Sequence, residues 1–128
     1  MRSDFLADLT STILAKTLDA TAARQKVIAN NIANVETPGY KRIYVSFEEE
    51  LQRVLEENSQ RSLRKQLSEL MPVQHVDWQS PSRPDGNNVS IDAEIAELVK
   101  NGMKQKAAAV LLEAKIAMLR SVIMEGKR

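Results

Sequence analysis

The sequence predicts a mainly α-helical chain, in which long N- and C-terminal helices pair as an antiparallel or an intersubunit coiled coil. A short middle helix and an irregular middle segment are expected between them. Apolar residues recur at helical spacing through both terminal parts of the chain. Pro38 and Gly39 are the first helix-breaking residues, so nothing interrupts a helix before them. Aromatic residues make up only 4% of the chain, which leaves burial to aliphatic side chains suited to helices packed side by side.

The N-terminal helix is predicted over residues 4–35. Its seam advances in alternating steps of four and three residues, which is the spacing of a coiled-coil heptad. The seam positions are Leu14, Leu18, Thr21, Gln25, Ile28, Ile32 and Val35. Thr21 and Gln25 place polar groups in this seam, which limits how well one hairpin could bury it.

A turn and an extended run are predicted over residues 36–46. Pro38 fixes the dihedral angle required at the second position of a type II turn, and Gly39 tolerates the positive φ required at the third. The segment 37–40 is therefore expected to end the helix. A β-prone run over residues 43–45 follows it.

A second helix is predicted over residues 47–57. Ser46 followed three residues later by Glu49 has the pattern of a capping box, which favours a helix start at Phe47. Its apolar face would consist of Phe47, Leu51, Val54 and Leu55, and the helix would end near Asn58.

Residues 58–89 are predicted to be a variable, loop-rich segment. An amphipathic pattern closed by Pro72 predicts a short helix over residues 62–71. A brief strand is expected over residues 73–78, with Trp78 anchoring the following loop on a helix. The rest is loop by composition, and a segment this polar is often mobile in an isolated chain.

The C-terminal helix is predicted over residues 90–125. Ser90 can cap it, and acidic residues in the first turn favour the positive end of its dipole. At 1.5 Å per residue it would be about 50 Å long. Its seam again steps by four and three through Ile91, Ile95, Leu98, Gly102, Gln105, Ala109, Leu112, Ile116, Leu119 and Ile123.

Three asparagines crowd the end of the first helix, although asparagine is a poor helix former. Asn30, Asn31 and Asn34 allow two interpretations. Their amides could cap the helix end locally, or they could contact a neighbouring chain. Under the second interpretation, Asn34→Ala should leave the stability of the free chain nearly unchanged while impairing assembly.

These residues also carry a family resemblance. The segment 29–34 followed by 37–41 resembles the N-terminal signature of the axial proteins of the bacterial flagellum, the rod and hook family. Residues 85–89 leading into 94–101 resemble the C-terminal signature of the same family. The short chain, without an inserted globular domain, is most similar to the proximal rod members. The residues expected to carry the signature and assembly are Asn30, Asn31, Ile32, Asn34, Thr37, Pro38, Gly39 and Tyr40.

The resemblance implies a structural rod subunit that is required for motility. Such a subunit is made in the cytoplasm, exported by the flagellar type III apparatus without a cleaved signal peptide, and assembled in the periplasm. It polymerises into the shaft that transmits motor torque to the hook. The implied partners are other flagellar rod proteins, further copies of the chain, the small adaptor FliE, the membrane ring and the flagellar export apparatus.

Seam residues of the two terminal helices are expected to pair with each other, either within one chain or between subunits. The residues proposed for this pairing are Leu14, Leu18, Ile28, Ile32, Ile95, Leu98, Leu112, Ile116, Leu119 and Ile123.

Composition and motifs argue against an enzyme. The chain has no cysteine and one histidine, His75, and it has neither a phosphate-binding loop nor a dinucleotide-binding glycine pattern. We therefore expect no catalytic, cofactor-binding or metal-binding residue and no small-molecule substrate. A net charge of +1 without a block of like charge gives no reason to expect nucleic-acid binding.

Two alternatives to the proximal rod protein stay open. One is another flagellar rod protein, and the other is a soluble helical-hairpin adaptor or export chaperone. A hairpin would be a monomer or closed dimer with a saturated core. Polar and small seam residues, as at Gln25 and Gly102, favour instead a single domain over residues 1–128 that is completed by its neighbours in an open polymer.

Overall fold

The computed structural model describes residues 2–57 and 60–126. The elements in chain order are α1 (Arg2–Ala33), β1 (Ile43–Ser46), α2 (Glu48–Glu57), α3 (Gln60–Glu69), β2 (Val73–Val76) and α4 (Ile91–Gly126). The two long terminal helices pack against each other, which confirms the predicted mainly α-helical fold class. The predicted end of the second helix near Asn58 lies outside the described residues.

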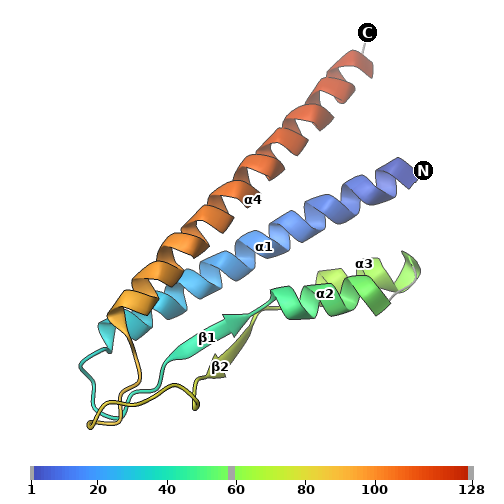
Figure 1. The fold of residues 1–128 in the computed structure, drawn as a ribbon. Coiled ribbons are helices and arrows are strands. Elements are labelled where there is room, and N and C mark those ends of the chain that lie inside the picture. The colour runs from blue at the N-terminus through green and yellow to red at the C-terminus, as the bar shows by residue number, and fades with distance from the viewer. Residues whose placement is uncertain (1, 58–59, 127–128) are drawn as a thin grey trace.

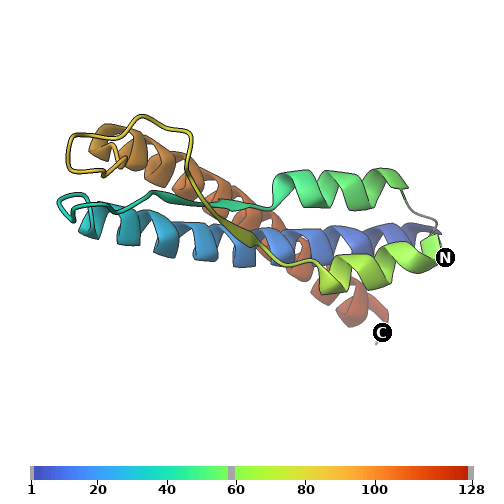
Figure 2. The same cartoon turned by 90° about the horizontal axis from the view of Figure 1, so that it is seen from below.

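The helix α1 is the central element. It contacts α4, the strand β1 and the helix α3. Figure 1 shows α4 running antiparallel to α1, with the β1–β2 hairpin, α2 and α3 on another side. The two long helices lie closest where α1 ends and diverge toward the termini (Figure 1). Figure 2 shows α2 and α3 alongside the N-terminal half of α1.

The hydrophobic core lies between α1 and the pair α2 and α3. Phe47 and Leu67 are almost wholly buried in it, at 1% and 0% exposure. Burial of each such side chain stabilises the fold by roughly 1.5 to 3 kcal/mol. The buried members of the cluster are Leu9, Ala20, Phe47, Leu63, Leu67 and Leu70, with Phe5, Ile13, Leu51 and Val54 packed against them. Within the described part of the chain, this cluster includes no residue of α4.

The face that α4 turns toward α1 is mostly polar. Its buried residues are Glu94, Asn101 and Ala108. Each of these three residues directly precedes a position of the predicted seam. At alternate seam positions, the residue that is buried is therefore one position earlier than predicted. Asn101 donates from Nδ2 to the Thr21 carbonyl at 2.8 Å, which joins the middle of α4 to α1.

The predicted seam residues divide by exposure. Ile28 is buried, whereas Leu14, Leu18, Ile32, Leu98 and Leu112 are half-buried. Ile95, Ile116, Leu119 and Ile123 are between 43% and 58% exposed. Pairing within the chain therefore accounts for only part of the seam. Pairing between subunits stays a prediction for the exposed residues.

The strands β1 and β2 form an antiparallel hairpin, with Ile43 opposite Val76. The Ser46 hydroxyl bonds to Glu50 at 2.9 Å and to His75 Nε2 at 2.8 Å, in place of the predicted capping box with Glu49. The prediction that Trp78 anchors the loop is wrong, because this side chain is 74% exposed. The sequence alone does not show whether a helix lies close enough for a single aromatic residue in a polar segment to pack against it.

An ionic link at Glu48 joins α2 to both long helices. Arg24 of α1 donates to Oε1 at 2.9 Å and to Oε2 at 2.7 Å, and Lys104 of α4 donates to Oε1 at 3.0 Å. Burial raises the pKa of Glu48, but the hydrogen bonds from Arg24 and Lys104 outweigh this effect and hold the pKa at about 2.

We expect the Glu48 link to stabilise the fold above its ordinary pKa of 4.5 and to be lost as the pH falls toward 2. Because the side chain is 48% exposed, the effect should stay below about 1 kcal/mol. Urea unfolding of the wild type and of Glu48→Gln should therefore differ at about pH 6 and converge near about pH 2. A difference that is unchanged at low pH would contradict this assignment.

Candidate functional site

Asn31 is the centre of a buried polar junction where α1 ends. Its Nδ2 donates to the Ile43 carbonyl at 2.7 Å and to Glu94 Oε2 at 3.0 Å. Its Oδ1 accepts from the Ile43 N–H at 3.0 Å and from the Tyr40 hydroxyl at 3.0 Å. The amide thus pairs with both backbone groups of one residue, as a neighbouring strand would. The backbone groups of Ile43 on β1 are thereby satisfied by a side chain of α1.

Glu94 and Arg42 form the charged part of this junction. Glu94 is completely buried, and Arg42 Nε donates to its Oε1 at 2.5 Å. Arg42 also forms an ion pair with Asp77, from Nη1 to Oδ2 at 3.5 Å. Burial raises the pKa of Tyr40, and the Glu94 charge raises it further. The Tyr40 hydroxyl therefore stays protonated and remains a donor to Asn31.

The exit turn of α1 packs against a second turn in the long loop. Gly39 has φ +74°, as the predicted type II turn requires, and its N–H donates to the Asp85 carbonyl at 2.8 Å. Gly86 has φ +88°, and a Cβ added there would lie 3.3 Å from the Gly39 Cα. Both glycines are therefore needed, one for its turn and the other for its turn and for the close approach of two backbones.

Asn87 completes the C-terminal end of α1. Its buried Nδ2 donates to the carbonyls of Asn34, Val35 and Thr37 at 2.9, 3.0 and 2.9 Å. Carbonyls at a helix end have no partner within the helix, so a side chain from another segment supplies the donor. Arg83 donates to the Val35 carbonyl as well.

Asn88 joins the same loop to the hairpin. Its Oδ1 accepts from the Arg42 N–H at 2.6 Å, and its Nδ2 donates to the Asp77 carbonyl at 2.7 Å. The N-terminal signature, the hairpin, the loop and the first turn of α4 are thus held in one hydrogen-bonded unit. We call this unit the junction; its side chains are those of Asn31, Tyr40, Arg42, Asn87, Asn88 and Glu94.

The junction has the chemistry of a structural joint. Its amides and charges contact one another or the backbone. Within the described part of the chain, no group of three His, Cys, Asp or Glu side chains is placed to hold a metal ion. Among residues 2–57 and 60–126, none of the helices has the length and hydropathy of a membrane span.

Comparisons with known proteins identify the family. A family model described as "Flagella basal body rod protein" matches residues 13–41. FlgB of Borrelia hermsii is 42% identical over 100 residues, which cover 67% of this chain and 74% of the relative. FlgB of Bacillus subtilis is 32% identical over 127 residues, 89% of this chain and 92% of the relative. FlgB of Salmonella typhimurium is 30% identical over 122 residues, 85% and 88% of the two chains.

The chain belongs to the FlgB family of flagellar rod proteins. It is a structural rod subunit of the flagellar basal body, and it assembles with other rod components. The residues matched by the family model include the end of α1 and the exit turn, and so they include Asn31 and Tyr40 of the junction.

The structure separates the three asparagines of the FlgB signature. Asn31 is buried and fully hydrogen-bonded inside its own chain, whereas Asn30 is exposed. The Asn34 side chain donates to the Asn30 carbonyl at 2.8 Å and accepts from the Thr37 hydroxyl at 3.1 Å, which is local capping. Ile32 and Tyr40 are half-buried, and Thr37, Pro38 and Gly39 are exposed. Contact of these exposed residues with a neighbour stays a prediction.

The resemblance places Asn87, Asn88 and Glu94 in the C-terminal signature of the family, but it does not predict that their side chains meet the N-terminal signature. Interaction with the helix dipole, predicted for the acidic first turn of α4, does not explain why Glu94 is buried. The sequence pattern assigns no role to Arg42. An acidic residue beside an apolar seam was the available signal for Glu94, but spacing alone does not say which face of a helix is buried.

Proposed function

We propose that this chain is the proximal rod subunit, which polymerises with copies of itself and with other rod proteins into the torque-transmitting shaft. The proposal includes export by the flagellar type III apparatus without a cleaved signal, and contacts with the adaptor FliE and the membrane ring. The single observation that carries the polymerisation is the unburied apolar surface of α4.

Large apolar side chains are exposed along the whole of α4. Each is more than 40% exposed in the single chain: Ile91, Ile95, Val99, Met103, Val110, Leu111, Ile116, Met118, Leu119, Val122, Ile123 and Met124. Contiguous exposed apolar surface of this kind marks an interaction site. Consecutive residues of a helix point in directions about 100° apart, so the run 122–124 needs cover on more than one side.

This surface supports an open polymer over a closed dimer. A two-fold dimer buries one patch on each copy against the same patch of its partner. Apolar residues exposed on several sides of one helix can be buried only by several neighbouring chains. A subunit inside a helical assembly has several such neighbours. Repeated head-to-tail contacts whose rotation does not close generate such an assembly.

Mass spectrometry of detergent-extracted basal bodies from the source bacterium tests the proposal. The chain should copurify in multiple copies with ring and rod, with the intact mass of the uncleaved chain. Cross-links to the membrane ring and FliE would support the proximal position. Cross-links only to distal rod or hook proteins would favour another rod position. Absence from basal bodies would overturn the proposal.

Asn34→Ala tests the half-buried asparagine of the signature that caps the end of α1 locally. Its side-chain contacts are local and exposed, so the variant should lower the free energy of unfolding in urea by less than about 1 kcal/mol. Swimming and the amount of chain in basal bodies should fall more strongly, because a contact to a neighbour is lost. A parallel loss of stability and assembly would instead show that Asn34 acts only within its own chain.

A further inference from the structure

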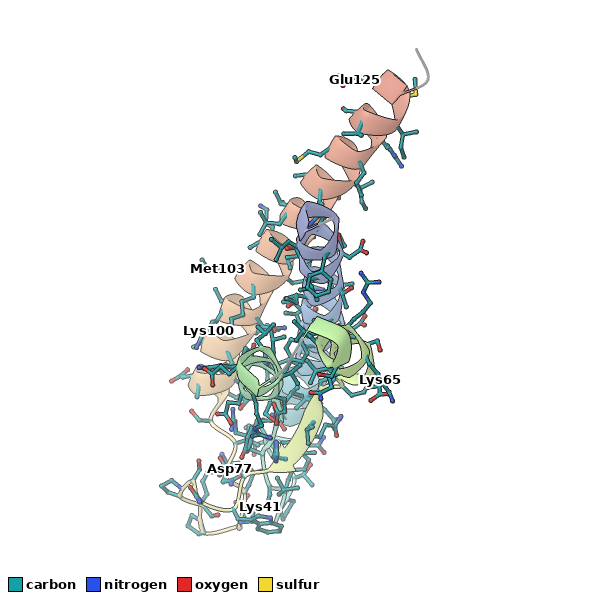
Figure 3. The ribbon with its side chains drawn as sticks, turned by 90° about the vertical axis from the view of Figure 1, so that its right-hand side faces the viewer. Lys41, Lys65, Asp77, Lys100, Met103 and Glu125 are labelled. Carbon is teal, nitrogen blue, oxygen red and sulfur yellow. The ribbon has the colours of Figure 1, made fainter. Side chains whose placement is uncertain are left out.

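The middle of α4 carries an apolar stripe on the side away from α1. We call it the lysine-flanked stripe; it consists of Val99, Met103, Ala107, Val110 and Leu111, with Lys100, Lys104 and Lys106 beside them. Its large apolar residues are between 55% and 70% exposed. Figure 3 shows Met103 projecting from α4 away from α1. Lys100 lies at the edge of the stripe and also lines a hollow together with Arg24 and Ile28 of α1. A shallow hollow of about 500 Å³ lies over Met103, Lys106, Ala107, Val110 and Leu111.

The charge around this stripe has one sign. No Asp or Glu occurs between Glu97 and Glu113, whereas three lysines do. Helical spacing places Lys106 on one side of the stripe and Lys100 and Lys104 on the other. Lys104 pairs with Glu48 of α2 in the same chain, but within residues 2–57 and 60–126 neither Lys100 nor Lys106 forms an ion pair.

From this complementarity we propose that the stripe binds an amphipathic helix of a neighbouring axial subunit, with carboxylates on both sides of its apolar face. The inference rests on the proposed function, because it requires neighbours in a polymer. The stripe spans 12 residue steps, so about 18 Å of partner helix would cover it. Paired apolar faces would supply affinity, and opposite flanking charges would set partner choice and register.

The ion pair between α4 and α2 within this chain has the same chemistry as the proposed contact, a lysine of α4 with a carboxylate of another helix. The helix α2 carries Glu48, Glu49 and Glu50 in its first turn. One of these carboxylates already reaches Lys104, at 3.0 Å. Gly102 is exposed beside the stripe, and a Cβ added there would meet nothing within 4 Å, so the partner can approach closely at that turn.

Charge reversal tests the flanking lysines. A chain with both Lys100→Glu and Lys106→Glu should be reduced at least about tenfold in purified basal bodies, because its flanks would repel a partner's carboxylates. The matched control carries both Arg53→Glu and Lys65→Glu, which reverse two exposed charges on α2 and α3 and should leave incorporation near the wild-type level. Circular dichroism of each free chain shows whether the helices are retained, as expected for exposed positions.

A photo-crosslinking amino acid in place of Met103 identifies what covers the stripe in assembled basal bodies. Mass spectrometry should find cross-links to a helical segment with acidic residues on both flanks, in a second copy of this chain or in another axial protein. Cross-links to lipid or to a segment without such acids would overturn the inference, as would normal incorporation of the charge-reversed chain. Absence of the wild-type chain from basal bodies would instead contradict the proposed function.

Discussion

Replacing Arg42 with methionine is expected to lower the free energy of unfolding by about 3 to 5 kcal/mol, because it leaves the Glu94 carboxylate buried without its cation. Glu94 is completely buried, and Arg42 Nε lies 2.5 Å from its Oε1. Asn31 would remain as a donor to Glu94, but a neutral amide does not balance a full charge. Urea unfolding at neutral pH measures the loss, with the slope showing whether the transition stays two-state.

Lys104→Met is the matched control, because it removes a cation from an ion pair that also joins two elements. Both partners of the Lys104–Glu48 pair are about half exposed, so its loss should cost less than about 1 kcal/mol. Adding Glu94→Leu to Arg42→Met should restore much of the stability, since an apolar pair can replace a buried ionic one. If Arg42→Met lowered the free energy of unfolding no more than Lys104→Met does, the result would contradict the burial of Glu94 and would show that water reaches its carboxylate in solution.

Asn31→Ala is expected to destabilise the chain by about 2 to 4 kcal/mol, because it leaves several buried groups without hydrogen-bond partners. The groups affected are the N–H and carbonyl of Ile43, the Tyr40 hydroxyl and the Glu94 carboxylate. The strand β1 would therefore lose its backbone pairing with α1 at Ile43. Urea unfolding measures the stability, and faster amide exchange at Ile43 would locate the loss.

Asn30→Ala provides the control within the same signature. Asn30 is the same residue type one position earlier, but its side chain is exposed. Since alanine is the better helix former, this change should leave stability within about 0.5 kcal/mol or raise it slightly. Equal effects of the two substitutions would show that the hydrogen bonds of Asn31 contribute little in water.

The long terminal helices were predictable because their sequences are periodic and uninterrupted. The exit turn was predictable as well, since only a few residue types meet the dihedral requirements that Pro38 and Gly39 meet, and Gly39 has the expected positive φ. These features depend on local sequence. They set which elements form and where the chain turns, but not which surfaces come together.

The junction depends on contacts between distant residues, and periodicity does not report them. Asn31 and Glu94 are 63 positions apart and meet only because α4 returns along α1. The seam of α4 shows the same limit. A row of isoleucine and leucine residues has the same spacing whether it is buried in its own chain or in a neighbour. Sequence therefore could not say that Ile95 and Ile116 would be exposed while Glu94 is buried.

The last turns of α4 have a kinetic consequence. Every described residue from Ile116 to Gly126 is exposed, so this end of the helix is held by its own backbone hydrogen bonds and not by packing. An unsupported stretch of this length is marginal as a helix in water, and helix and coil interconvert in about 0.1 to 1 μs. In a free chain these amides should exchange with solvent rapidly, while those of α1 above the core are protected. The subunit would then dock in the rod with the C-terminal end of α4 still fraying. The conformational entropy of that end would be lost on docking rather than on folding.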